Sequence, residues 1–182
     1  MNDESQPMED AEDVDEEMSP KQEAIFIRRY HLGAVAEESA HMESLLRSIF
    51  SALLGSPRAN VVAAGQSVTW LIENSLAVID ANDKVRGPSL GESDNVARFR
   101  SAIAGCKDLN TRRNHLIHGA WVDGLPDGRP GHSLLRSKLR QPWPFAEEVS
   151  SNDIEKLARD LASAVSELMK AIFEVKGIIA GT

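Results

Sequence analysis

The sequence of 182 residues contains one cysteine, Cys106, and few aromatic residues, which make up 5% of the chain. A single cysteine excludes a disulfide within the chain. No apolar run approaches the roughly 20 residues that a membrane-spanning helix needs, and the N-terminal segment is neither basic nor apolar, as a targeting segment would be. The sequence therefore predicts a soluble, cytoplasmic protein with no membrane partner, in which Cys106 is a buried thiol.

Positive charge is absent from the first twenty residues, which contain nine aspartates and glutamates and no lysine or arginine. Such a run of like charges repels itself and cannot bury a core, which predicts a disordered acidic tail over residues 1–20. Subtracting these nine acids from the formal net charge of −8 leaves the rest of the chain at +1. The acidity therefore belongs to the tail and does not exclude a polyanionic partner for residues 21–182, which suit a single domain.

Apolar residues at three- and four-residue spacing predict four long helices, and four such helices make a bundle. The helices are expected at about Lys21–Leu54, Arg58–Asn82, Ser93–Gly119 and Asn152–Ile179. Glycine or proline follows the first two and ends the third, as is typical of helix termini. The predicted fold class is therefore all-α, a four-helix bundle.

Residues 120–140, between the third and fourth predicted helices, alternate as short strands do and predict a small β-ribbon. The strands are expected at Ala120–Asp123 and His132–Arg140, joined by a loop rich in glycine and proline. One face of the second strand carries the cations Arg136, Lys138 and Arg140. We expect these three residues to bind RNA; the alternative is a solvated edge that deters strand pairing.

The third predicted helix carries an apolar stripe that turns polar toward its C-terminal end. The stripe consists of Phe99, Ile103, Cys106 and Leu109. At about 100° per residue, Arg113 falls about 20° from Cys106, and Asn110 and Asn114 fall on the same sector, which His118 closes. Burying an arginine and two amides costs several kcal/mol unless partners or a ligand satisfy them. The polar end of the stripe therefore predicts a functional site.

The arrangement R-N-x-x-x-H, formed by Arg113, Asn114 and His118, resembles the motif of the HEPN superfamily, helical-bundle proteins of which many are ribonucleases. The resemblance implies a HEPN-like bundle with metal-independent endoribonuclease activity, RNA as the substrate and no cofactor. It also implies a role as a toxin or defence effector, with a cognate antitoxin or a nucleotidyltransferase as a partner. In many proteins of this family two copies meet and line one cleft with paired Arg and His residues, which implies a homodimer.

The residue types of the motif fit that chemistry. His118 would transfer protons, because the ordinary pKa of histidine lies close to neutral pH. Arg113 would stabilise the charge on the phosphate through its fork of donors, which matches two oxygens at once. Asn114 would orient His118 or a phosphate oxygen. Because one histidine cannot easily perform both proton transfers, a second group is needed.

Each of these residues also has a purely structural alternative. Arg113 could reach solvent or a carboxylate such as Glu43, and His118 could satisfy the last carbonyls of its helix. His115 is expected to be exposed, and a metal pair of His115 and His118 has no acid or thiol nearby to complete it. Arg28 falls on the apolar side of the first helix, where an internal ion pair is expected. The alternative function is a non-catalytic HEPN-fold module that binds a nucleotide, RNA or protein partner, and a structural adaptor is a third.

Overall fold

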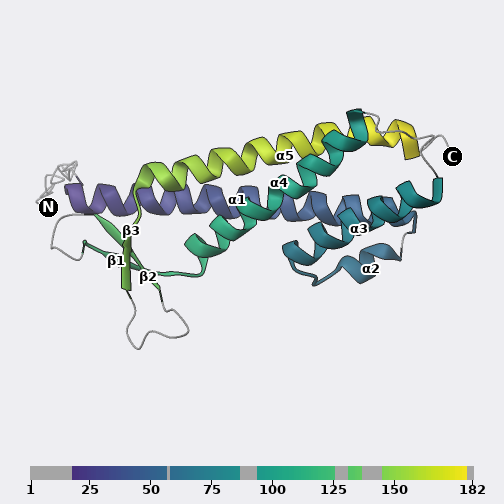
Figure 1. Ribbon diagram of the computed structural model, residues 1–182. Helices are drawn as coiled ribbons and strands as arrows, with labels where there is room; N and C mark the ends of the chain where they lie inside the picture. Colours follow the sequence, from purple (N-terminus) through teal and green to yellow (C-terminus); the bar gives the residue numbers. More distant parts are fainter. Residues whose placement is uncertain (1–17, 57, 87–93, 126–130, 137–144, 180–182) are drawn as a thin grey trace, which may run out of the picture.

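Four long helices lie side by side in this computed structural model, and a small sheet covers one end of them (Figure 1). The structure describes residues 18–56, 58–86, 94–125, 131–136 and 145–179. The elements are α1 (Pro20–Leu54), α2 (Ala59–Ala63), α3 (Val68–Arg86), α4 (Asp94–Ile117), β1 (Ala120–Asp123), β2 (His132–Arg136), β3 (Phe145–Glu148) and α5 (Ser151–Ile179). The mostly helical fold predicted from the sequence is therefore confirmed. Among the described helices, none has the length and apolar character needed to cross a membrane.

Helix α1 begins at Pro20 because the preceding residue, Ser19, caps it. The Ser19 hydroxyl accepts a hydrogen bond from the Gln22 backbone N–H, and the Gln22 side chain accepts one from the Ser19 N–H at 2.8 Å. This reciprocal pair satisfies two donors that a helix N-terminus otherwise leaves open. Helix α1 therefore begins one residue before the expected start at about Lys21, and the acidic residues of the predicted tail, which precede Met18, lie outside the described residues.

The second predicted helix is wrong, because the structure divides it into α2 and α3. The break falls at Gly65, which has a φ of 76°, a left-handed backbone that side-chain-bearing residues rarely adopt. Ser67 then starts α3 by accepting a hydrogen bond from the Trp70 backbone N–H at 3.2 Å. The described residues thus contain five helices rather than four, although α2 has only five residues.

The sheet has three antiparallel strands in the order β1-β2-β3, whereas the sequence predicted two. Strand β1 has the predicted bounds, and β2 ends at Arg136 in the described part of the chain. The third strand pairs with β2 so that Leu134 lies opposite Glu147. Its sequence, Phe-Ala-Glu-Glu, has weak strand propensity, and the pairing with β2 supplies what the local sequence does not.

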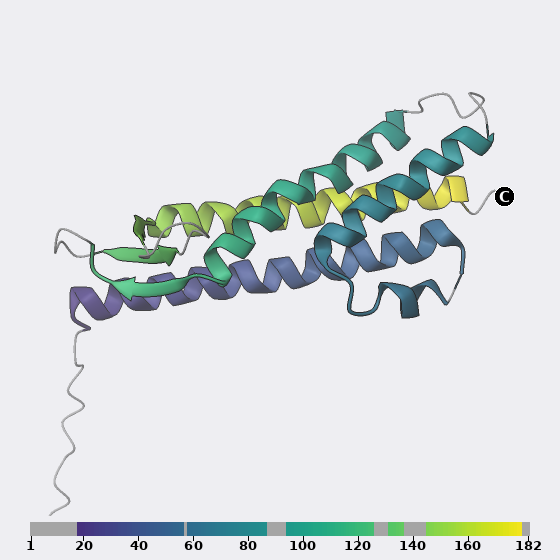
Figure 2. The ribbon, with the colours of Figure 1, turned by 60° about the horizontal axis from the view of Figure 1, so that its bottom comes forward.

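Helix α4 runs antiparallel to α3 and extends past its beginning (Figures 1 and 2). The contacts between the two helices progress in register: Arg100 pairs with Asp80, Lys107 Nζ lies 3.3 Å from Glu73 Oε1, and Asn110 Nδ2 donates to Thr69 Oγ1 at 3.3 Å. Thr69 is the second residue of α3. The last two turns of α4, which carry Arg113 and Asn114 and lead to His118, therefore have no α3 beside them.

The turn from α4 into β1 requires a glycine at position 119. A Cβ atom there would lie only 2.7 Å from Cγ of Leu134, and Leu134 is fully buried in the core. Trp121 fastens the same turn, because its indole Nε1–H donates to the Leu116 carbonyl oxygen at 3.0 Å. The end of α4 is thus held against the sheet on both sides of His118.

We expect Gly119→Ala to destabilise the fold by about 1 to 3 kcal/mol, because a buried leucine cannot move away from the added methyl group. Gly105→Ala in the same helix is the matched control, since nothing lies within 4 Å of its Cβ position. That change should stabilise α4 by about 0.5 to 1 kcal/mol. Urea denaturation of both variants measures the difference, and equal stability of the two would contradict the close packing of Gly119.

Candidate functional site

Arg113 is half-buried on α4 and carries a charge that no carboxylate neutralises within the described residues. Its Nη1 donates to Asn114 Oδ1 at 2.8 Å, while its Nε is buried and has no hydrogen-bond partner. The structural alternative of a pair with Glu43 is not realised, because Glu43 pairs with Arg47 on its own helix. A half-buried guanidinium with an unsatisfied donor costs free energy unless an anion completes it.

The neighbours of Arg113 on the predicted stripe are satisfied inside the protein. Asn110 is 7% exposed and bonds to Thr69, and Cys106 is fully buried, with its thiol donating to the Ala102 carbonyl. Burial raises the pKa of Cys106 to about 11, so the thiol is neutral and unreactive near pH 7. The prediction of a buried thiol is therefore confirmed. Cys106 and Asn110 find hydrogen-bond partners inside the protein, whereas Arg113 has a buried donor without one.

His118 lies just beyond the last residue of α4 and is exposed. Its backbone N–H still donates to the Asn114 carbonyl oxygen at 3.2 Å, so its backbone continues the helical turn. Its imidazole makes no hydrogen bond or ion pair within the described part of the chain. The helix-capping alternative therefore finds no support, and the ring is open to a ligand.

The structure brings Arg113 and Asn114 together, but among the described residues neither side chain forms a hydrogen bond or an ion pair with the His118 side chain. On an ideal helix, Asn114 lies about 100° round from Arg113 and His118 about 40° further. Because the guanidinium reaches round to Asn114, its charge lies closer to His118 than the position of Arg113 on the helix suggests. Residues 114 and 118 are four apart and so are neighbours on one helix face.

His115 is not exposed as the sequence predicted. Its side chain is 21% exposed, and its Nε2 lies 3.2 Å from Glu147 Oε2. The error came from the missed strand β3, which brings Glu147 beside the last turn of α4. The carboxylate of Glu147 therefore lies near His115, where no acid was expected beside a metal pair of His115 and His118. Even so, no group of three or more metal-ligating side chains exists within the described ranges.

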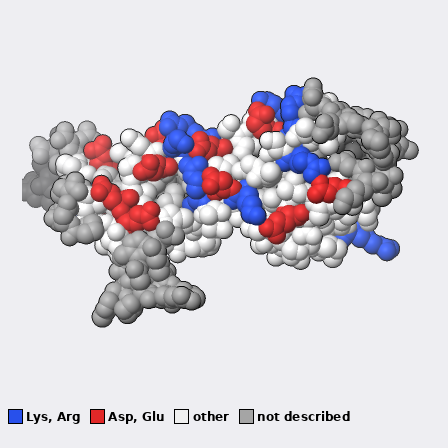
Figure 3. Space-filling view, in the orientation of Figure 1, with Lys and Arg blue, Asp and Glu red and all other residues white. Residues whose placement is uncertain are grey.

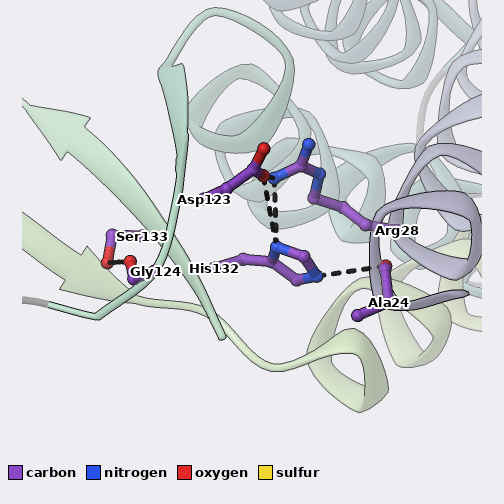
Figure 4. A network of polar contacts seen from close by, with 6 residues as sticks. All are labelled: Ala24, Arg28, Asp123, Gly124, His132 and Ser133. Carbon is purple, nitrogen blue, oxygen red and sulfur yellow. Dashed lines mark hydrogen bonds and ion pairs between the residues drawn. The ribbon is translucent and has the colours of Figure 1, made fainter. Parts of the chain in front are cut away.

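A second polar cluster, of which the sequence indicated only Arg28 and none of its partners, links α1 to the sheet (Figure 4). Arg28 is 7% exposed, and its Nη1 donates to Asp123 Oδ1 at 2.7 Å and to His132 Nδ1 at 3.1 Å. Because arginine only donates, His132 Nδ1 must accept and its Nε2–H donates to the Ala24 carbonyl at 3.1 Å. The guanidinium also lies over the Trp121 ring, 5.5 Å from its centroid. The predicted internal ion pair of Arg28 thus exists, with Asp123 as its partner.

This cluster borders a cavity of about 680 Å³ between the start of α1 and the turn after β1. Asp123 and His132 line the cavity, but Arg113, Asn114 and His118 do not. Both ring nitrogens of His132 are already bonded, so the histidine acts as a structural bridge. The cavity therefore carries no reactive group of the candidate site.

The predicted basic face of β2 is not an open surface along its first residues. His132 and Leu134, which share that face with Arg136, are 6% and 0% exposed. The side chain of Arg136 and all of Lys138 and Arg140 lie outside what the structure describes, so their binding of RNA stays a prediction. On the face shown in Figure 3, cations and acids alternate along the helices, and acids gather near the sheet.

Arg28, which is buried, and Arg113, which is half-buried, give a matched test of whether Arg113 serves the fold or a functional site. Arg28→Met should destabilise the protein by about 2 to 4 kcal/mol, because it removes two charged hydrogen bonds and leaves His132 Nδ1 buried without a donor. Arg113→Met should leave the free energy of unfolding within about 1 kcal/mol of the wild type or raise it, because no charged partner is stranded and Asn114, which loses one donor, is only half-buried. Urea denaturation measures both, and a loss at Arg113 as large as that at Arg28 would assign Arg113 a structural role.

Comparison with protein-family models finds no match to the chain, and searches of the curated proteins and of the solved structures find none either.

Proposed function

We propose that this protein is a metal-independent endoribonuclease of the HEPN type, with Arg113, Asn114 and His118 at its active site. One observation carries the proposal: the half-buried guanidinium of Arg113 has no carboxylate partner in the described residues, and its Nε has no acceptor. Phosphate is one of the anions that a guanidinium fork matches, since it accepts two parallel hydrogen bonds. An exposed, unbonded imidazole follows one turn later, at His118.

In the proposed reaction the chain supplies proton transfer and charge stabilisation. His118 removes the proton of the ribose 2′-hydroxyl, whose oxygen then bonds to phosphorus while the bond to the 5′-oxygen breaks. Arg113 binds the phosphate oxygens as negative charge grows on them. Asn114, which accepts a hydrogen bond from Arg113, holds the guanidinium in place. The products are a 2′,3′-cyclic phosphate and a 5′-hydroxyl.

The substrate in this proposal is RNA, because the attacking group is the 2′-hydroxyl that DNA lacks. Arg136, Lys138 and Arg140 would extend the contact along the strand. We further propose action in the cytoplasm as a toxin or defence effector, regulated by a cognate antitoxin or a nucleotidyltransferase. The motif's resemblance to the HEPN superfamily supports these points and also supports a homodimer, which light scattering at micromolar concentration tests directly.

We expect the purified protein to cleave total RNA in the presence of EDTA and to leave 2′,3′-cyclic phosphate ends. His118→Ala and Arg113→Met should each lower the cleavage rate by about 10²- to 10⁴-fold, the range typical of a lost proton-transfer or charge-stabilising group. Gel electrophoresis and end-group analysis of the products measure both effects. Because Arg113→Met keeps its stability in this account, its loss of activity cannot be attributed to unfolding.

Abolition of cleavage by EDTA, or an unchanged rate in His118→Ala, would exclude this mechanism. A non-catalytic module that binds a nucleotide, RNA or a protein is the second candidate, and the same unneutralised charge of Arg113 favours it. Such a module needs Arg113 but not His118. Retention of RNA by the wild type without cleavage, lost in Arg113→Met and kept in His118→Ala, would favour the module over the enzyme.

A further inference from the structure

RNA cleavage by proton transfer needs a base for the 2′-hydroxyl and an acid for the departing 5′-oxygen, and His118 can serve as only one of them. We propose that His115, held by Glu147, is the acid of the same active site. This inference rests on the proposed function. It places both proton-transfer groups in one chain, so that a second copy is not required for the second proton.

The position of His115 on α4 suits this role. It precedes His118 by three residues and lies about 60° round the helix from it, so the two side chains are neighbours on the helix surface. Asn114, which accepts a hydrogen bond from the guanidinium of Arg113, lies on the other side of His118, about 40° away. A phosphate placed over His118 would therefore have the arginine on one side and His115 on the other. In-line displacement requires this kind of separation between the base and the acid.

The contact with Glu147 determines which nitrogen of His115 is available. Glu147 is fixed by the pairing of β3 with β2, and its Oε2 lies 3.2 Å from Nε2 of His115. This contact turns Nε2 toward the Glu147 carboxylate and leaves Nδ1 as the ring nitrogen open to other groups, and no partner of His115 Nδ1 exists within the described residues. Glu147 thus orients the ring from outside the reacting atoms and is a positioning residue.

His115 and Glu147 also line a cavity of about 230 Å³ between the end of α4, β3 and the start of α5. Glu148, Asp153 and Arg112 line the same cavity. Arg112 precedes His115 by three residues on α4, and it donates to Asp160 at 2.9 Å. That hydrogen bond lowers the pKa of Asp160 and keeps the carboxylate charged. Lys156 lines the cavity as well, so charges of both signs surround it. In this proposal the phosphate binds on the Arg113 side of His118, where the half-buried guanidinium has no carboxylate partner in the described residues, and His115 faces the departing oxygen.

The step balances without any further reactant. The 2′-oxygen forms its bond to phosphorus and loses its proton to His118. The bond from phosphorus to the 5′-oxygen breaks, and the 5′-oxygen takes the proton from His115. Water is not consumed, and the two histidines exchange protonation states until solvent restores them.

A leaving group that needs no proton separates an acid from a residue that only supports the fold. The test compares a short oligoribonucleotide that spans a cleavage site mapped in total RNA with the same oligonucleotide carrying a 5′-bridging sulfur there. Sulfur departs as a thiolate, so an acid is no longer needed. His115→Ala should cleave the oxygen substrate about 10²- to 10⁴-fold more slowly than the wild type and recover most of that loss on the sulfur substrate. His118→Ala should be slow on both.

Two further variants sharpen the comparison. Glu147→Gln keeps an acceptor for Nε2 but removes the charge, and it should show a smaller loss on oxygen that is also recovered on sulfur. His41→Ala is the matched control, because His41 is an exposed histidine that lies 3.7 Å from Glu38 on α1 and is not part of the proposed site. It should cleave both substrates at the wild-type rate. Melting temperatures close to that of the wild type confirm that the four variants are folded.

The outcomes distinguish the two proposals. A wild type that cleaves neither substrate overturns the proposed function and the role of His115 together. A wild type that cleaves in EDTA, with His115→Ala equally fast, overturns only the role of His115 and assigns the second proton transfer to another copy. Equal slowing of His115→Ala on oxygen and sulfur also overturns it, because a structural defect ignores the leaving group. Selective recovery on sulfur supports it.

Discussion

The candidate site exists because α4 is longer than the helix packed beside it. Helix α3 begins at Val68, and its second residue already bonds to Asn110, so α3 does not cover the last two turns of α4, although α5 still packs against another side of them. Covering them with an apolar helix would exclude Arg113 and Asn114, since a guanidinium and an amide lose their hydration on burial. The sheet replaces the helix at this end of the molecule and brings polar backbone and side-chain groups with it.

Three contacts fix the sheet to the end of α4 and to α1. Trp121 bonds to the Leu116 carbonyl, Gly119 packs on Leu134, and Arg28 fixes the β1–β2 pair to α1. These contacts set the backbone of His118 without using its imidazole. A proton-transfer residue requires a fixed backbone and an accessible side chain, because its position must be set while its ring contacts the substrate. The same sheet, through β3, places Glu147 beside His115.

Local patterns predicted the long helices well, and they failed where a single residue or a distant pairing decides the structure. The stripes of α1, α4 and α5 are long and periodic, so their bounds are close to those expected. The helix expected over residues 58–82 includes Gly65, but the left-handed backbone of this glycine separates α2 from α3. Strand β3 depends on β2, and the partners of Arg28 and His115 lie far along the chain, at Asp123 and Glu147. Such pairs have no local signal. The stripe did single out Arg113, which is half-buried without a carboxylate partner in the described residues, whereas its role in an active site stays a prediction.

The central claim is that Arg113 is held ready for an anion, and the Nε–H resonance of that side chain tests it most directly. The resonance is assigned by its absence from Arg113→Met and followed while the protein is titrated with fully 2′-O-methylated RNA, which binds but cannot be cleaved. We predict a saturable shift of the Arg113 signal, with the paired Arg28 unchanged as the internal control. RNA binding that leaves the Arg113 resonance unmoved would contradict the assignment of this residue to the phosphate.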